Sequence, residues 1–402
     1  MHILWVKVGG LWPLNTGGRL RSFHLINELS QRHRVTVLTT HGPADDPSGL
    51  SEHLPACDQI ISVPWELPKK GSTRFAMALM RSWFSAYPVD LWKCRIPPLA
   101  KEVKRLLKTG VDVCIADFLA AVPNVPMGDG VPVVLFEHNV EHLIWQRLTQ
   151  HEKSPWRRAL LGIESSKMRR READACRRAD LTLAVSETDG AVLHEIAPAA
   201  KIAAVPTGVD TSYFTPNGGP SSDHALVFTG SLDWFPNEDA ILYFLEEMFP
   251  AIRESVKDVT LTVVGRNPSA KLTAAMQATD GARLTGTVDD VRPYVHDGAV
   301  FVVPLRIGSG TRLKIFEALA MGKAVVSTSI GAEGLGLEHG THFLQADTPR
   351  DFASAVISLL RDPARRDGLG HAARSLVETH YSWPQVSRRF EELLQPVQRT
   401  SS

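Results

Sequence analysis

The chain has 402 residues, and at about 150 residues per domain this length predicts two or three domains rather than one. Its hydrophobic fraction of 44% and charged fraction of 22% are close to the globular average, which excludes a disordered, collagenous or coiled-coil chain. Lys plus Arg equal Asp plus Glu at 44 each, so the net charge gives no reason to expect nucleic acid as a partner.

The apolar runs of the sequence are short. They hold only a handful of residues, whereas a membrane-spanning helix needs about 20, so we expect no segment to cross a bilayer. The start, MHILWVKVGG, breaks its apolar run at Lys7 and is typical of a buried strand rather than a signal peptide. No Cys-x-x-Cys pair occurs among the four cysteines, which fits a reducing compartment. These features predict a cytoplasmic protein.

In chain order, short β-branched runs alternate with longer amphipathic stretches, the pattern of parallel strands joined by crossover helices. A helix is expected over Gly18–Gln31, where apolar residues recur at helical spacing behind a glycine pair. The strands predicted in the first half are Ile3–Val8, Val35–Thr39, Gln59–Val63, Val113–Ala116, Val133–Phe136, Leu181–Val185 and Ile202–Val205.

After Val205, the segment PTGVDTSYFTPNGGPSSD has no period and predicts a linker over residues 208–222. The alternation then restarts, so we expect domains over residues 1–207 and 223–385, with a C-terminal helix and tail over 386–402 that packs back on the first domain. The strands predicted in the second half are Ala225–Thr229, Thr260–Val264, Arg283–Gly286, Ala299–Val303, Ala324–Ser327 and His342–Gln345.

The loop PLRIGSGTRLKIFEALAMGKAVVS, residues 304–327, is the most informative. Gly308 and Gly310 would let the backbone approach a ligand, and a helix opening near Thr311 would aim its N–H groups at the same place. Arg312 and Lys314 would lie in the first turn, where positive side chains oppose the helix dipole. Their position predicts a bound anion, which indicates a phosphate site.

Other strand-end loops of the second half are expected at the same place. Arg266, which follows a strand in VVGRNPS, is a candidate diphosphate ligand because guanidinium binds phosphate oxygens in a bidentate way; alternatively it caps a carbonyl. Glu317 could accept hydrogen bonds from sugar or ribose hydroxyls, or form a simple i,i+3 pair with Lys314.

Two first-half loops carry candidates. GGLWPLNTGGRLR has no G-x-G-x-x-G, so nicotinamide binding is poorly supported, but Gly17 and Gly18 at a helix start either meet an anion or form a plain tight turn. In LFEHNVEHLIWQR, His138 and Asn139 end a strand and either bind a substrate hydroxyl or merely pack. His138 and His142 are four apart without a third ligand, so no metal is expected.

The stretch from Lys153 to Arg178 holds nine Lys or Arg side chains. Such a stretch suits a face laid on anionic lipid headgroups, which would place the protein peripherally at the inner face of the cell membrane. A solvated helix face with i,i+4 ion pairs explains it equally well.

A series of motifs in a fixed order resembles a known family. These are the Gly17-Gly18 loop, EHNVE, VSETD, VPTGVD, GSLDWFPN, VVGRNP, TGTVDDVRPY, PLRIGSGTRLKIFEALAMGKAVVST and GAEGL. From residue 3 to about 390 the chain resembles nucleotide-sugar-dependent glycosyltransferases of family 4. The resemblance implies the GT-B fold, in which two Rossmann-like, doubly wound parallel-sheet domains face each other across a cleft.

By this resemblance Glu317 matches the second Glu of the family's Glu-x7-Glu motif and would contact the donor nucleotide or ribose. Lys314 and Arg266 would hold the diphosphate and His138 would meet the transferred sugar, so these three are the expected catalytic residues. Asn139 would contact acceptor or sugar. The further residues expected at the donor are Gly17, Gly18, Gly230, Arg306, Gly308, Ser309, Gly310, Thr311 and Arg312.

The sequence departs from the family pattern at two places. Ser309 stands where the first Glu of the motif is expected, and SLDWFPN replaces the Arg and Lys that often follow the glycine at Gly230. Neutralisation of the phosphates is therefore left to Arg266, Arg306, Arg312 and Lys314.

The resemblance implies transfer of a sugar from a nucleoside diphosphate sugar to a hydroxyl of a saccharide or lipid-linked acceptor, with retention. The enzyme would be of the hexosyltransferase type and act in polysaccharide or glycolipid assembly, without a metal or other cofactor. Two alternatives remain open. A nucleotide-sugar 2-epimerase uses the same two-sheet architecture, and a non-catalytic nucleotide-sugar-binding protein is suggested by Ser309.

Overall fold

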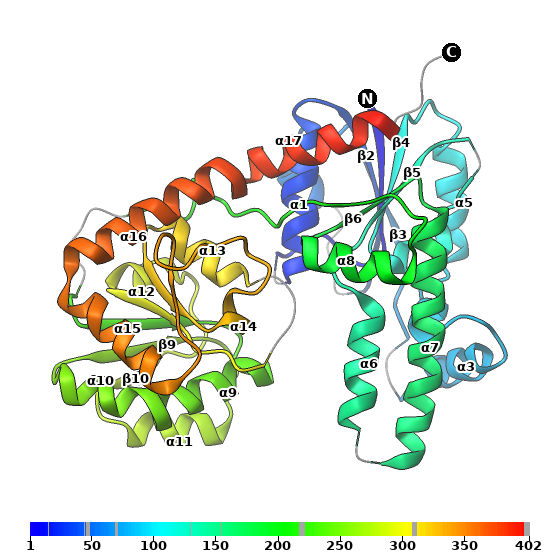
Figure 1. The fold of residues 1–402 in the computed structure, drawn as a ribbon. Helices are drawn as coiled ribbons and strands as arrows, with labels where there is room; N and C mark the ends of the chain where they lie inside the picture. Colours follow the sequence, from blue (N-terminus) through cyan, green and yellow to red (C-terminus); the bar gives the residue numbers. More distant parts are fainter. Residues whose placement is uncertain are drawn as a thin grey trace. The chain divides into compact units, whose positions relative to one another are not determined.

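The computed structural model describes residues 1–14, 16–43, 45, 49–68, 71–128, 130–152, 154–216, 222–307 and 312–397. The chain forms two compact units (Figure 1). Unit 1 is Met1–Pro206 together with the segment from Val386, and unit 2 is Thr207–Gln385.

Unit 1 is built on a parallel seven-stranded sheet with the order β3-β2-β1-β4-β5-β6-β7. The central strands β1, β4, β5 and β6 are buried along their whole length, as expected of parallel strands covered by helices on both faces. The strands are β1 (His2–Lys7), β2 (Arg34–His41), β3 (Gln59–Pro64), β4 (Val113–Asp117), β5 (Val133–Phe136), β6 (Leu181–Ala184) and β7 (Ile202–Ala204).

The helices of unit 1 begin and end at recognisable signals. The Thr16 side chain caps the first helix by accepting from the Arg19 backbone N–H at 3.3 Å, and the longest helix opens at Pro155. The helices are α1 (Gly17–Ser30), α2 (Gly49–His53), α3 (Thr73–Trp83), α4 (Val89–Lys93), α5 (Pro97–Leu106), the 3-10 helix η1 (Leu119–Asn124), α6 (Glu141–His151), α7 (Pro155–Arg178) and α8 (Glu187–Ile196).

Unit 2 holds a parallel six-stranded sheet with the order β10-β9-β8-β11-β12-β13. Its strands are β8 (Ala225–Thr229), β9 (Thr260–Val264), β10 (Ala282–Leu284), β11 (Val300–Val303), β12 (Ala324–Ser327) and β13 (Leu344–Gln345). Its helices are α9 (Phe235–Tyr243), the π-helical turn η2 (Phe244–Met248), α10 (Phe249–Ser255), α11 (Ala270–Ala278), α12 (Arg292–Asp297), α13 (Leu313–Ala320), α14 (Ser329–Ala332), α15 (Pro349–Arg361), α16 (Pro363–Leu376) and the π-helical turn η3 (Val377–Tyr381).

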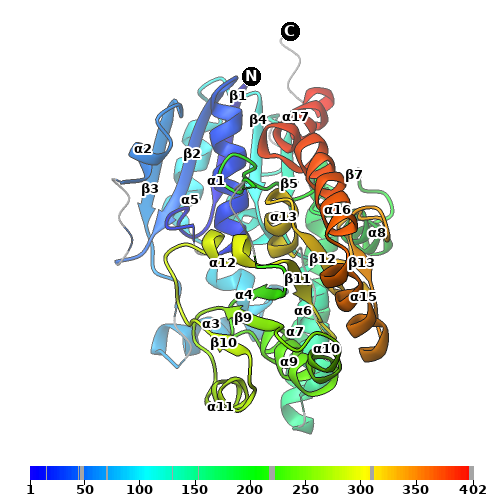
Figure 2. The ribbon, with the colours of Figure 1, turned by 90° about the vertical axis from the view of Figure 1, so that its left-hand side faces the viewer.

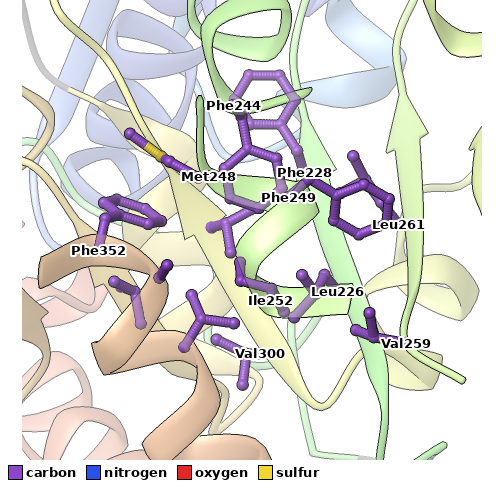
Figure 3. Close-up of a cluster of buried hydrophobic side chains, with 14 of the residues drawn as sticks. Leu226, Phe228, Phe244, Met248, Phe249, Ile252, Val259, Leu261, Val300 and Phe352 are labelled. Carbon is purple, nitrogen blue, oxygen red and sulfur yellow. The ribbon is translucent and has the colours of Figure 1, made fainter. Parts of the chain in front are cut away.

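One face of the unit 2 sheet is covered by an aromatic core (Figure 3). Phe228 on β8 meets Phe244 and Phe249 from the helical segment that follows α9, and Phe352 of α15 packs against Phe244 with ring centroids 6.0 Å apart. Each buried aromatic side chain contributes about 1.5–3 kcal/mol of hydrophobic stabilisation. This core holds β8 and β11 in place, and so fixes the loops that leave their carboxyl ends.

The segment after Pro206 and the C-terminal helix α17 (Trp383–Leu394) connect the units along the chain. Val209 is buried in a core of unit 2 and pairs with Ser382, so part of the stretch expected to be a linker packs on that unit. From Val386 the helix belongs to unit 1, where the Phe390 ring stacks on Trp5 with centroids 5.7 Å apart.

The predicted fold class is confirmed, because both sheets are parallel and flanked by helices. Each of the thirteen predicted strands is present, with ends that differ by at most two residues. No helix in the described part of the chain is both long and apolar enough to cross a bilayer.

Candidate functional site

In unit 2, Lys314 lies in the first turn of α13 and reaches the loop that follows β8. Its Nζ donates to Asn237 Oδ1 at 2.8 Å and lies 4.0 Å from the centroid of the Phe228 ring. The ammonium group of Lys314 has three N–H donors, and one of them is used in the hydrogen bond to Asn237. Among the contacts of the described residues, the other two N–H groups are available to an anion. The lysine is thus held by a neutral amide and an aromatic face.

The electrostatics of this place favour a ligand that brings negative charge. Burial, with a smaller contribution from Arg312, lowers the pKa of Lys314 to about 7. Burial likewise raises the pKa of Glu317, one turn further along α13, to about 7, while Lys314 opposes that shift. A diphosphate near Lys314 would favour its charged form, because an opposite charge stabilises the ammonium.

Two strand-end loops meet beside Lys314. A Cβ added at Gly230, directly after β8, would lie 2.6 Å from Lys314 Nζ, so a glycine is needed for the lysine to lie there. The next residue, Ser231, accepts from Arg266 Nε at 2.8 Å. Arg266 follows β9, so its side chain joins the two loops through this hydroxyl, and its contact with a diphosphate stays a prediction. A Cβ at Gly265 would overlap the carbonyl oxygen of Gly230, so the two loops pack backbone against backbone.

The other cationic candidates have protein partners. Arg306 is exposed and forms a bidentate pair with Asp239, at 2.6 and 3.1 Å, while stacking over the Tyr243 ring. Arg312 is buried at the N-cap of α13, and its Nη2 donates to the Ile330 carbonyl oxygen at 3.5 Å. The candidates Gly308, Ser309, Gly310 and Thr311 lie outside the described residues.

In unit 1, a network of charged groups is buried at the carboxyl ends of two neighbouring strands. Lys7 ends β1 and Asp117 ends β4, and the two residues are partners in the register of these strands, which run side by side (Figure 2). Lys7 Nζ lies 3.1 Å from Asp117 Oδ2 and donates to Ser22 Oγ at 2.9 Å, while Trp5 Nε1 donates to the same carboxylate at 2.8 Å.

His138 belongs to this network. Arg21 Nη1 donates to its Nδ1 at 2.9 Å, so the proton of the neutral ring is on Nε2, which lies 2.8 Å from Asp117 Oδ1. Burial, helped by Arg21 and Lys7, lowers the pKa of His138 to about 3. Burial opposes ionisation of Asp117, but Lys7 and His138 outweigh it and hold the pKa of that carboxyl well below its usual range. The imidazole is therefore a neutral, oriented group at the end of β5.

Gly18 packs against Phe118, the aromatic residue that stacks on His138. Phe118, with φ of +69°, stacks on the His138 ring at a centroid distance of 3.8 Å. A Cβ at Gly18 would lie 2.6 Å from Phe118 Cζ. Gly18 therefore lets the first turn of α1 approach Phe118, and its contact with a ligand stays a prediction, as does that of Gly17.

We expect Gly18→Ala to destabilise the protein by about 1–3 kcal/mol, because the added methyl group displaces Phe118 from His138. Gly190→Ala on α8 is the matched control: its Cβ would have neighbours no nearer than 3.8 Å, and alanine favours a helix by up to about 1 kcal/mol. Urea unfolding of both variants measures the difference. Equal stability of the two variants would contradict the close packing of Gly18.

The geometry of both units agrees with comparisons of the sequence with known families. The family described as "Glycosyltransferase Family 4" matches residues 17–213, and the family described as "Glycosyl transferases group 1" matches residues 223–362. The two matches cover both units in order. The chain is a glycosyltransferase of the family 4 type.

Two relatives with similar sequences match different shares of this chain. An uncharacterised 44.6 kDa protein in the cps region of Klebsiella pneumoniae is 22% identical over 96% of this chain and 97% of its own length. The lipopolysaccharide 1,2-N-acetylglucosaminetransferase of Salmonella typhimurium is 25% identical over 50% of this chain and 58% of its own length. The chain thus spans little more than half of the Salmonella enzyme.

Solved structures establish the fold of the glycosyltransferase as GT-B. Sucrose-phosphate synthase from Thermosynechococcus elongatus matches with a TM-score of 0.70 and 17% identity, covering 98% of both chains. Anabaena HepE, solved in complex with UDP, matches with a TM-score of 0.67 and 14% identity, covering 98% of this chain and 100% of its own.

The glycosyltransferase has further buried polar groups near its candidate residues. Asn139 hydrogen-bonds Glu141, whose pKa is raised to about 7 by burial and by Glu172. Glu137 is buried at the end of β5, and burial together with Glu172 and Glu141 raises its pKa well above the usual range. His142 Nδ1 lies 2.5 Å from Glu172 Oε2, so this histidine has a structural partner. Among the described residues, no group of three His, Cys, Asp or Glu side chains could hold a metal ion.

Sequence reasoning missed several members of the two clusters. Asn237, Arg21 and Asp117 contact candidate residues, and Lys7 pairs with Asp117, yet none of the four is predicted as a site residue. For Lys7 and Asp117 the available signal is a single charged residue at the end of an otherwise apolar strand, as in ILWVK and VCIAD. Asn237 had no such signal, because it lies inside α9 and only the fold brings it to Lys314.

Proposed function

We propose that this glycosyltransferase moves a sugar from a nucleoside diphosphate sugar to an acceptor hydroxyl, with retention, in polysaccharide or glycolipid assembly. The observation that supports this function best is the cluster around Lys314. Its ammonium group, the Gly230 loop and Arg266 lie together at the carboxyl ends of β8 and β9, where open parallel sheets bind their ligands.

Loss of the diphosphate is the step that this cluster would assist. As the sugar–phosphate bond breaks, negative charge grows on the leaving phosphate, and donors already aimed at that charge stabilise the transition state most. Lys314 and Arg266 supply cationic donors, and the N-terminus of α13 adds its dipole. The leaving phosphate can itself take the proton of the acceptor hydroxyl, so no separate general base is required.

The relatives support a nucleotide-linked donor and a glycan or lipid-linked acceptor. HepE was solved with UDP, and the Salmonella relative is named as a transferase of lipopolysaccharide. His138 is proposed to meet the transferred sugar, because its neutral ring is oriented by Arg21 and Asp117 at a strand end.

The test of donor binding is the thermal unfolding of the full chain with UDP-, GDP- and ADP-sugars. A ligand at 100 times its Kd stabilises the native state by about 2.7 kcal/mol, so one nucleotide class should raise Tm by several degrees. Glu317→Ala should reduce this rise, because the variant loses an acceptor for donor hydroxyls, whereas Glu254→Ala on the exposed face of α10 should keep it. An undiminished rise for Glu317→Ala would contradict its role.

The acceptor dependence of the reaction separates the alternatives. A transferase forms product only with an added acceptor, whereas a 2-epimerase releases nucleotide without one. A non-catalytic binder would be stabilised by the donor and would turn over no acceptor.

A further inference from the structure

Unit 1 exposes a set of large apolar side chains on α3 and α7 that the catalytic proposal does not use. On α3 and its C-cap these are Met77, Met80, Trp83 and Phe84, of which Phe84 is 90% exposed. On α7 they are Trp156, Leu160 and Ile163. We call these seven residues the α3–α7 patch. Large apolar side chains gathered on one surface usually mark an interaction site.

Helical spacing places the members of the patch on continuous faces. Met77, Met80 and Phe84 follow an i, i+3, i+7 spacing, so they line one side of α3, while Ala78 and Ser82 are buried on the other. Trp156, Leu160 and Ile163 follow an i, i+4, i+7 spacing on α7. Lys167 continues the same stripe one turn later.

Hydrogen bonds hold α3 and its C-terminal turn against α7, beside which it lies in Figure 1. Lys167 Nζ donates to the Ser82 carbonyl oxygen at 2.9 Å, and Arg171 Nε donates to that of Ala86 at 3.1 Å. The Val89 backbone N–H donates to Glu164 Oε2 at 2.6 Å. The α7 stripe thus leads to Lys167, where α7 touches the C-terminal end of α3.

The charged side chains on the two helical segments that carry the patch are basic. Arg74 and Arg81 are exposed on α3, and Arg157 and Arg170 are exposed on α7. The sequence contains no Asp or Glu between Gly71 and Val89 or between Ser154 and Ile163. The basic stretch noted in the sequence is thus only one edge of this surface, and Arg171 lies instead over the Tyr87 ring.

We propose that the α3–α7 patch docks the protein on an anionic lipid surface, with its aromatic and Met side chains entering the headgroup region. Helices that lie in the membrane interface combine Trp, Phe and Leu on one face with Lys or Arg beside them. A protein partner would be expected to meet a charge-depleted centre with a mixed-sign rim, whereas the charged side chains of α3 and of α7 up to Ile163 are all arginines. Anionic headgroups complement it, each arginine adding about fivefold to the affinity.

The test is co-sedimentation of the full chain with vesicles of phosphatidylcholine alone or mixed with phosphatidylglycerol. Wild-type protein should pellet with the mixed vesicles and lose affinity at high salt. The Arg74→Gln/Arg81→Gln variant should bind the mixed vesicles about 25-fold more weakly. Arg388→Gln/Arg389→Gln changes the same charge on an exposed part of α17 and should bind like wild type.

The apolar part of the patch is tested separately with Trp83→Ser/Phe84→Ser, whose side chains are exposed and whose loss should leave the unfolding transition unchanged. This variant should lose the binding that persists at high salt. Absence of vesicle binding by wild-type protein, or equal binding by all variants, would overturn the proposal. Concentration-dependent self-association abolished by Trp83→Ser/Phe84→Ser would assign the patch to a second copy of the chain instead.

Discussion

Replacing Lys314 with alanine is expected to lower kcat/KM by about 30- to 1000-fold, which corresponds to about 2–4 kcal/mol of lost transition-state stabilisation. The reason is its position. The ammonium group lies beside the Gly230 loop, joined to Asn237 at 2.8 Å, at the place where the leaving diphosphate is proposed to develop charge. Steady-state kinetics with the nucleotide sugar that stabilises the protein measures the effect.

Lys323→Met is the matched control for this prediction. Lys323 follows the other end of α13, is also largely buried, and donates to the carbonyl oxygens of His296 and Gly298 at 2.6 and 2.9 Å. Its loss should reduce the free energy of unfolding and leave kcat/KM close to wild type. If Lys314→Ala turned over the donor at a near-normal rate, Lys314 would have no part in the chemistry.

Asp117→Asn should destabilise unit 1 by about 3–5 kcal/mol at neutral pH, because it leaves the buried Lys7 ammonium without its paired carboxylate. Burial lowers the pKa of both Lys7 and Arg21, and Asp117 opposes the change in each, together with Asp189 in the case of Arg21. Urea unfolding measures the loss. The double variant Lys7→Met/Asp117→Asn should lose less free energy of unfolding than the two single variants added together. The reason is that neither charge of the ion pair is then left buried without its partner.

The stabilisation of the protein by Asp117 should depend on pH. The pKa of Asp117 is lower in the folded than in the unfolded state, so its stabilisation is complete above about pH 4 and is lost as the pH falls below that value. The gap between wild type and Asp117→Asn should therefore narrow in acid. Asp280→Asn, which breaks an exposed pair with Arg253, should change little at any pH. A gap independent of pH would contradict the buried pair.

Much of the fold could be predicted from the sequence because strand-sized apolar runs alternate with helical patterns in both halves. The short β-branched runs VVLF and AVVS appear as β5 and β12, buried along their whole length. The structure of the predicted linker, residues 208–222, could not be predicted in the same way. This segment has no period, as expected of a linker, but Val209 is buried in unit 2 and pairs with Ser382, some 170 residues away, and no local pattern indicates such a contact.

The candidate site was predictable only where chemistry follows local rules. A lysine in the first turn of α13 and an arginine after β9 stand out because they occupy strand and helix ends. Asn237, Asp117 and Arg21 do not stand out, since each gains its partner through long-range folding. The anion contact of Gly18 stays a prediction, and the structure adds a packing requirement set by Phe118 that no local pattern indicates.

The backbone contact between Gly230 and Gly265 limits how the family framework can diversify in this chain. Any side chain at position 265 would collide with the Gly230 carbonyl, and any at position 230 would displace Lys314 or Asn237. A side chain at position 265 would therefore separate the two loops, and one at position 230 would move the lysine that the proposed function depends on. Exposed side chains nearby, such as those of Trp234 and Phe235, can be replaced without disturbing the backbone contact between Gly230 and Gly265.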